Sequence, residues 1–249
     1  MAFLPGTPDA DTLPGTDDID VIFGDLGNDT ITGAAGNDFL SGDEGDDNIT
    51  TGLGDDIVLG GTGNDTIGGM AGRDVVLAGN GNDIIAWNDP TGDAVFGGQG
   101  NDTILGGNVA ADTIFGGGGD DLIRAFANSP GNATAADLLL GNDGKDVVLG
   151  GDATDTIEGG RGDDFLTGNG GADAFIFRAS DKGTGTDTIT DFDPAEDVVQ
   201  LIGFEQGLDP VAALSDTPLG TVLDLGGDNS VLFLGRVAAE FSANDFLIT

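Results

Sequence analysis

The 249-residue sequence has no cysteine, no histidine and no tyrosine, and it has 7 Lys plus Arg against 45 Asp plus Glu. Without cysteine there is no disulfide framework, so something else must hold the fold together. Without histidine the chain lacks the usual general base and the commonest metal-binding imidazole. These absences argue against an enzyme. A formal net charge of −38 repels nucleic acid and anionic lipid, so we expect neither as a partner.

Long apolar runs are missing as well. No stretch approaches the roughly 18 apolar residues of a membrane-spanning helix, and the N-terminus lacks the basic and apolar regions of a signal peptide. We therefore expect no transmembrane segment and no secretion signal at the N-terminus. Yet 38% of the residues are hydrophobic, more than a disordered acidic tail usually holds. A solvating acidic surface would explain the charge but not the regular spacing of the acids.

That spacing comes from a nine-residue repeat. The stretch "GGTGNDTIGG" at 60–69 returns with small changes as "GDLGNDTIT" from Gly24, "GGQGNDTIL" from Gly97 and "GGRGDDFLT" from Gly159. Each unit has Asp at position 6 and an apolar residue at position 8. Such units run from Gly6 to Ile176. Repeats of this kind must be identified before single strands or helices are assigned, because they determine the architecture.

Each unit predicts a tight turn followed by a very short strand. Positions 1 to 6 are mostly Gly, Asn and Asp, which tolerate positive φ. Positions 7 to 9 form a strand too short to be stable alone, so neighbouring units must stack. Two units per coil would give a flattened tube of about nine coils with parallel strands about 4.8 Å apart. The expected fold is therefore all-β, a parallel roll.

If two units make one coil, alternate units share a side of the tube. The position-6 residues of side A are Asp11, Asp29, Asp47, Asp65, Asp83, Asp102, Asp121, Asp146 and Asp164. Those of side B are Asp20, Asp38, Asp56, Asp74, Asp93, Asp112, Asp137, Asp155 and Asp173.

Stacked turns would place carboxylates in columns that need cations. Carboxylate and carbonyl oxygens together suit a hard cation such as calcium, which takes six to eight of them. The sequence thus predicts multiple calcium ions. The candidate ligands are Asp29, Asp47, Asp65, Asp83, Asp102, Asp121, Asp146 and Asp164 on side A, and Asp20, Asp38, Asp56, Asp74, Asp155 and Asp173 on side B.

The unit resembles the GGxGxDxUx nonapeptide of the RTX (repeats-in-toxin) family, a calcium-binding β-helix repeat. The resemblance covers residues 6–176 and implies a right-handed parallel β-roll with calcium between the turns of successive coils. RTX exoenzymes normally carry a catalytic domain before the repeats. Because the repeats here begin at Gly6, the resemblance predicts no enzyme activity for these residues.

The tail extends the resemblance. "ADAFIFRASDKGTGTDTITDFDPAEDVVQL" is similar to the segment that closes RTX arrays, and the last residues, ending Asp245-Phe246-Leu247-Ile248, resemble a terminus read by type I secretion systems. We therefore divide the chain into an RTX roll at 1–176 and a C-terminal cap and secretion region at 177–249. The resemblance implies a secreted or cell-surface protein that engages the type I secretion machinery.

The two sides differ at position 4, where Gly supplies the turn. Side A keeps it in every unit after the first, whereas side B has Asp18, Thr91, Ala110, Ala135 and Ala153 at five turns. We therefore expect more calcium on side A. Inserted residues also lengthen three side-B turns, at 87–93, 106–112 and 125–137. This loop lobe is explained by drift on a tolerant face, or alternatively by contact with a partner.

Side chains at positions 7 and 9 point away from the tube. On the sheet that follows side B they are mainly Val21, Phe23, Phe39, Ile57, Leu59, Val75, Leu77, Phe96, Phe115, Leu138, Leu140 and Ile176. So long an apolar strip usually marks a contact surface. We expect it to meet another copy of the chain or to be covered by residues 177–249. On the other sheet a Thr ladder, which a flat ice-binding array would need, fades into Leu105 and Leu122.

The leading hypothesis is a secreted calcium-binding roll that folds on calcium outside the cell and acts in surface, matrix, assembly or binding roles. The alternative is a passive secretion and folding module with no partner of its own. A membrane-active RTX protein is disfavoured because the chain has no basic amphipathic or long apolar segment.

Overall fold

The computed structural model describes residues 1–87, 90–107, 110–125, 135–181, 185–205 and 207–249. These residues form strands, turns and three short 3-10 helices, namely η1 (Ala179–Asp181), η2 (Ala238–Glu240) and η3 (Ala243–Asp245). Among them no helix is long and apolar enough to cross a membrane. The expectation of an all-β chain is confirmed.

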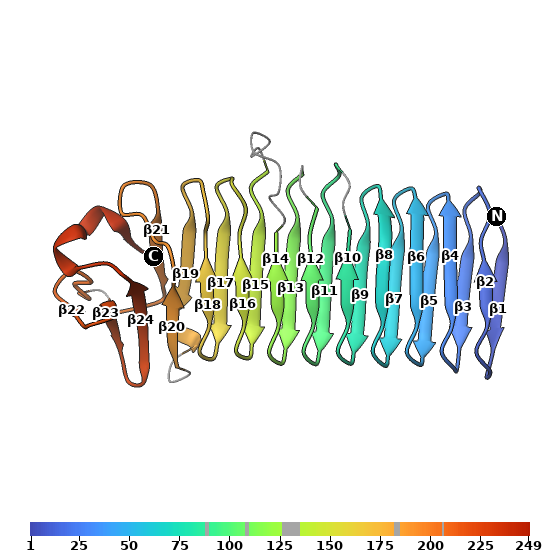
Figure 1. The fold of residues 1–249 in the computed structure, drawn as a ribbon, viewed down its shortest axis with the longest axis horizontal. Helices are drawn as coiled ribbons and strands as arrows, with labels where there is room; N and C mark the ends of the chain where they lie inside the picture. The colour runs from blue at the N-terminus through green and yellow to red at the C-terminus, as the bar shows by residue number, and fades with distance from the viewer. Residues whose placement is uncertain (88–89, 108–109, 126–134, 182–184, 206) are drawn as a thin grey trace.

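The strands form two sheets that face each other along one long body (Figure 1). The sheet that contains the strands after the side-B turns is called the B sheet. In spatial order it contains β1 (Phe3–Thr7), β3 (Val21–Asp25), β5 (Phe39–Glu44), β7 (Ile57–Thr62), β9 (Val75–Asn80), β11 (Ala94–Gln99), β13 (Thr113–Gly118), β15 (Leu138–Asp143), β17 (Thr156–Arg161), β19 (Ala174–Arg178), β21 (Val198–Ile202) and β25 (Phe246–Ile248).

The opposite sheet, called the A sheet, follows the side-A turns. In spatial order it contains β2 (Thr12–Pro14), β4 (Thr30–Ala35), β6 (Asn48–Leu53), β8 (Thr66–Ala71), β10 (Ile84–Ala86), β12 (Thr103–Leu105), β14 (Leu122–Arg124), β16 (Val147–Leu149), β18 (Phe165–Thr167), β20 (Thr186–Ile189), β24 (Asn229–Leu234), β23 (Gly220–Gly226) and β22 (Leu214–Asp216).

Successive coils pair in register. Ile57 of β7 lies opposite Val75 of β9, and Thr30 of β4 lies opposite Asn48 of β6, so strands of regular coils pair with counterparts eighteen residues on. Where residues are inserted the separation is larger, yet the equivalent positions still pair, as for Thr113 of β13 and Leu138 of β15. All pairings within the roll are parallel, whereas β22, β23 and β24 pair antiparallel. The predicted parallel solenoid of about nine coils is confirmed.

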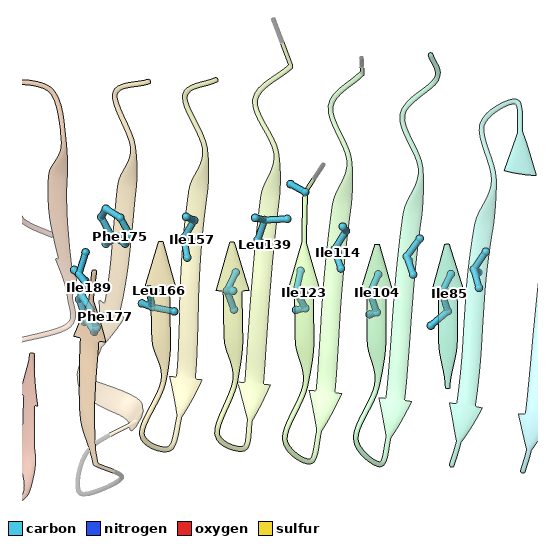
Figure 2. Packing of buried hydrophobic residues seen from close by; sticks show 14 of the residues in the cluster. Ile85, Ile104, Ile114, Ile123, Leu139, Ile157, Leu166, Phe175, Phe177 and Ile189 are labelled. Atoms are coloured by element: carbon cyan, nitrogen blue, oxygen red, sulfur yellow. The ribbon is translucent and has the colours of Figure 1, made fainter. Parts of the chain in front are cut away.

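The position-8 side chains fill the tube, as Figure 2 shows for its central and C-terminal part. From Ile22 to Phe175 each is at most 1% exposed, while Leu13 in the first coil is only partly buried. Burial of one such side chain contributes about 1.5–3 kcal/mol. Because no single coil encloses its own core, these contacts are made with neighbours, and the apolar column stabilises the stack as a whole.

Strand lengths depart from the expected three residues. The B-sheet strands from β5 to β17 are six residues long and continue into positions 1 to 3 of the following side-A turn. On the A sheet, β4, β6 and β8 are equally long, but β2, β10, β12, β14, β16 and β18 have three residues. Most of the short strands lead into side-B turns that lack Gly at position 4.

The roll continues beyond Ile176. Strand β20 extends the A sheet and β21 extends the B sheet, which adds one further coil. The β23–β24 hairpin then closes one sheet and β25 the other. Phe192, Phe233 and Phe241 pack together with ring centroids 4.8–5.6 Å apart and close the end of the tube. The division at 176/177 stays a prediction.

The described residues of 177–249 lie at the C-terminal end of the body and do not fold back over the B sheet (Figure 1). Ile57, Val75 and Leu77 therefore remain exposed, at 47%, 38% and 43%. The expectation that the tail covers the apolar strip is wrong for this central part.

Much of the loop lobe, including residues 88–89, 108–109 and 126–134, lies outside the described residues. Trp87, the first residue of the lobe, is described and only 6% exposed. It packs in the core cluster, and its backbone N–H donates to the carbonyl of Leu105 in the next coil. Trp87 is therefore a core residue rather than a contact on the outside.

Candidate metal centre

The position-6 aspartates form two continuous ladders. Each backbone N–H donates to the Oδ1 of the equivalent Asp one coil further on, for example from Asp47 to Asp65 at 2.9 Å and from Asp65 to Asp83 at 2.8 Å. On side B the bond from Asp38 to Asp56 is 2.7 Å. Every position-6 Asp after the first is buried. Stacking thus fixes one carboxylate oxygen of each Asp by a charge-assisted hydrogen bond.

The second oxygen, Oδ2, is left without a hydrogen bond in most turns. This buried, unpartnered atom occurs in Asp29, Asp38, Asp47, Asp56, Asp65, Asp83, Asp102, Asp112, Asp121, Asp146 and Asp164. The set includes every side-A turn after the first. A buried charge without a partner costs several kcal/mol, so this pattern calls for a cation.

Backbone carbonyls converge on the same places. A Cβ atom built on Gly42 would lie 2.2 Å from Asp47 Oδ2 and 2.6 Å from the carbonyl oxygen of Gly60 in the next coil. At Gly97 the corresponding distances are 2.3 Å to Asp102 Oδ2 and 2.6 Å to the oxygen of Gly116. Each position-1 residue therefore borders a space where a carboxylate and a carbonyl oxygen from successive coils meet.

Turn conformation produces this arrangement. Position-4 glycines have φ between +106° and +153° throughout side A after the first turn, from Gly27 to Gly162. Position 2 is also at positive φ, even where it is not Gly, as in Asp25 at 77° and Ala34 at 78°. Gly accepts this region without penalty, whereas other L-residues are strained by roughly 1–2 kcal/mol. The repeated Gly-x-Gly therefore holds the turn open around Oδ2.

Without a cation these carboxyl groups keep their protons to a higher pH than an exposed Asp side chain does. Burial raises the pKa of Asp65 and Asp102 to about 7 and that of Asp146 to about 8. Neighbouring carboxylates of the same column add to the rise. A bound cation would reverse this tendency by stabilising the charged form. The oxygen-only donor set, its negative charge and its carbonyl content fit calcium.

Comparison with known families agrees with this chemistry. The model of the RTX calcium-binding nonapeptide repeat matches residues 5–40, 14–49, 32–67, 50–85, 89–123, 134–157 and 149–178, together more than half of the chain. The chain belongs to the RTX calcium-binding nonapeptide-repeat family. The repeats of this RTX chain bind calcium. A search of curated proteins found no significant match.

Two solved structures match parts of this chain. The extracellular lipase LipA from Serratia marcescens matches 82% of this chain at 21% identity with a TM-score of 0.45, and this chain spans 40% of the lipase. The AlgE6R3 subunit of the mannuronan C5-epimerase from Azotobacter vinelandii matches 59% of this chain and 78% of that subunit, at 27% identity and a TM-score of 0.27.

The predicted ligands of the RTX roll fall into three groups. All the side-A candidates, with Asp38 and Asp56, present the open geometry just described. Asp74 and Asp173 are buried in the side-B ladder, with backbone N–H groups that donate to Asp93 and Asp197. Asp20 and Asp155 differ, because their Oδ2 atoms accept hydrogen bonds from their own turns.

Two members of the columns were missed. Asp187 accepts the N–H of Asp164 and continues side A, while Asp197 accepts that of Asp173 and continues side B. They lie 23 and 24 residues after Asp164 and Asp173, which does not fit the nine-residue repeat. The signal that could have found them is the unit ending, since "TDTIT" and "AEDVV" keep Asp two residues before a buried aliphatic side chain, Ile189 or Val199.

Proposed function

We propose that this protein is secreted through the type I route, folds on calcium outside the cell, and acts as a surface or matrix component that associates with other copies of itself through the B sheet. The role is one of binding and assembly rather than catalysis. The observation that carries the proposal is the exposed, uncharged outer surface of the B sheet on a chain with a net charge of −38.

The surface consists of two rows of side chains that run across neighbouring strands. Register places Ile57 beside Val75 in one row, and Leu59 beside Leu77 and Phe96 in the other. Phe96 stacks on Phe115 with ring centroids 4.8 Å apart and planes 3° apart. These contacts make the outward residues one continuous apolar strip, which we call the B face.

The charge pattern supports a second copy as the occupant. In these rows no charged residue occurs from β3 to β15, and the first is Glu158 of β17, which pairs with Arg178 at 2.6 and 3.0 Å. Acidic turns border the strip on both sides. A face that pairs with itself forms an isologous dimer, in which each uncharged strip covers the other and the acidic edges remain in solvent.

A concentration series by sedimentation velocity in calcium tests the association. Self-association predicts a sedimentation coefficient that rises with protein concentration, whereas a passive secretion and folding module predicts a monomer at every concentration. The same series in chelator shows whether association needs the folded roll.

A matched pair of variants locates the interface. Leu59→Asp with Leu77→Asp places two charges on the B face and should give a monomer with an unchanged number of bound calcium ions. The control, Thr30→Asp with Thr66→Asp, makes the same change in charge on the exposed face of the A sheet and should still associate. A double B-face variant that associates like the original chain would contradict the proposal.

A further inference from the structure

Not every turn of the roll has the open geometry. In the turns of Asp11, Asp20, Asp155 and Asp197 the Oδ2 atom accepts the N–H of its own position-2 residue, which is Thr7, Thr16, Gly151 or Asp193, at 2.6–2.7 Å. Each of these turns has Asp or Ala at position 4, whereas the open turns have Gly there, except the Asp112 turn, which has Ala110.

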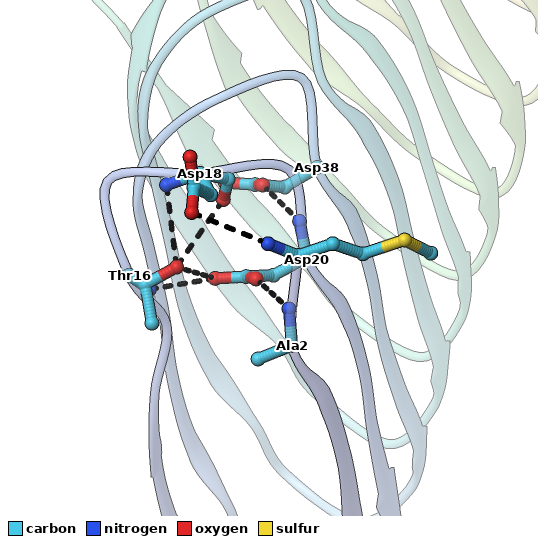
Figure 3. Close-up of polar contacts among 6 residues, drawn as sticks. Ala2, Thr16, Asp18, Asp20 and Asp38 are labelled. Atoms are coloured by element: carbon cyan, nitrogen blue, oxygen red, sulfur yellow. Dashed lines mark hydrogen bonds and ion pairs between the residues drawn. The ribbon is translucent and has the colours of Figure 1, made fainter.

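The first coil shows the closed form on both sides. The hydroxyl of Thr16 donates to Asp20 Oδ2 at 2.8 Å in addition to the backbone N–H, and Thr7 does the same to Asp11. Figure 3 shows Thr16 on one oxygen of Asp20 and the N–H of Ala2 on the other. Neither Thr7 nor Thr16 has a positive φ, which a β-branched residue resists. The Oδ2 atom of each carboxylate thus accepts two hydrogen bonds from its own turn, and in Asp20 the Oδ1 atom is bonded as well.

The Asp155 turn is closed from two directions. The Gly151 N–H donates to Asp155 Oδ2 at 2.6 Å. The next coil donates to two carbonyl oxygens of the turn, from Asn169 Nδ2 to Gly150 at 2.7 Å and from the Gly170 N–H to Gly151 at 3.1 Å. The preceding strand, β16, stops after three residues, unlike β7, the six-residue strand that leads into the open turn of Asp65. The oxygens that could hold an ion are already hydrogen-bonded.

We propose that the turns of Asp11, Asp20, Asp155 and Asp197 carry no calcium and that the chain's own N–H groups replace the ion there. This inference rests on the proposed calcium-dependent folding and replaces the expectation that Asp20 and Asp155 are ligands. The ion-free turns are then both turns of the first coil and the last turn of side B. The Asp155 turn interrupts the side-B column from within, so side A carries a continuous series of ions and side B does not.

A single substitution converts the Asp155 turn to the consensus. Ala153→Gly makes residues 150–155 read "GGDGTD", which has glycine at positions 1, 2 and 4 like the open turn of Asp65. Position 2 can then move to positive φ and release Asp155 Oδ2. We expect one more calcium ion per chain than in the original protein.

Native mass spectrometry of the full chain in calcium counts the ions directly. Ala172→Gly is the matched control, because it makes the same change at position 5 of the neighbouring side-B turn, and its count should equal that of the original chain. Gly54→Ala is the reverse change in an open side-B turn, where φ is +127° and the new Cβ would lie 1.6 Å from the Gly36 oxygen. Its count should fall.

The outcomes separate this inference from the proposal on which it rests. A count for Ala153→Gly equal to that of the original chain, or an anomalous calcium peak beside Asp155 in a crystal of the original chain, would overturn the closed-turn inference alone. The absence of calcium from the original chain and from all variants would overturn calcium-dependent folding itself.

Discussion

At the scale of single residues, the position-4 glycine favours the open turn because it adopts positive φ without strain. Gly63 has φ +129°, and a Cβ there would lie 2.0 Å from the carbonyl oxygen of Gly45. Gly63→Ala should therefore lower the stability of the calcium-bound roll by more than the roughly 1–2 kcal/mol of backbone strain, because the clash with the backbone adds to it. It should also remove at least one bound ion.

Thermal unfolding in calcium measures this loss against a matched control. Gly118→Ala adds the same methyl group at position 3 of a side-A turn, where it would contact only the flexible end of Gln99 at 2.9 Å. We expect the control to unfold close to the temperature of the original chain. Equal unfolding temperatures for the two variants would refute the special role of position 4.

Thr16 gives a second test at this scale. Thr16→Val keeps the shape and the backbone N–H but removes the hydroxyl that donates to Asp20 Oδ2. Loss of a hydrogen bond to a charged group should cost about 1.5–3 kcal/mol at most, less where water can replace it, as in this exposed turn. The midpoint of the calcium titration should shift slightly while the number of bound ions stays the same. A lower ion count would show that the Asp20 turn holds calcium.

At the scale of whole columns, the account predicts a pH dependence for the calcium-free chain. The ordinary pKa of an Asp side chain is near 3.8, whereas burial in the folded columns raises it to about 6 in Asp47 and to about 7 in Asp65. Between these values the folded state binds more protons than the unfolded state. The stability of the calcium-free roll is therefore greatest below about pH 4 and falls as pH rises through 6–7.

Circular dichroism in calcium-depleted buffer checks this direction. The β signal should be stronger at pH 5 than at pH 8, and calcium should be needed most at the higher pH. Replacing Asp65 and Asp102 with Asn removes two of the titrating groups and should flatten the dependence. A β signal that grows toward pH 8 without calcium would contradict the assignment.

The two columns should differ in occupancy. Side A keeps its position-4 Gly in every turn after the first, whereas side B loses it at five turns. Anomalous scattering from bound calcium should therefore show more ions along side A. Full and equal occupancy at the turns of Asp93, Asp112, Asp137 and Asp155 would contradict this.

At the scale of the whole molecule, the repeat made most of the fold predictable. An apolar residue two places after each Asp placed the core correctly. Loss of the position-4 Gly marks all four closed turns, but the Asp112 turn has also lost it and still leaves Oδ2 unpartnered. Other features depend on long-range packing that local sequence does not encode. Asp187 and Asp197 join the columns because strands β20 and β21 pair with the roll, although the segments before them break the repeat length. Trp87 follows directly on Ala86, which pairs with Leu105 of the next coil, so the ladder continues through the Trp87 N–H and the side chain is buried. The nine-residue repeat did not show this, because Trp87 is an inserted residue.

Calcium-coupled folding is the central claim, because the roll buries columns of carboxylates on a chain with a net charge of −38. Binding and folding then form one equilibrium, since the sites exist only when successive coils are stacked. The most direct measurement is far-UV circular dichroism at neutral pH, in chelator and in millimolar calcium. The account predicts a largely unfolded spectrum in chelator and a cooperative change to a β spectrum as calcium is added. A complete β spectrum in chelator would contradict it.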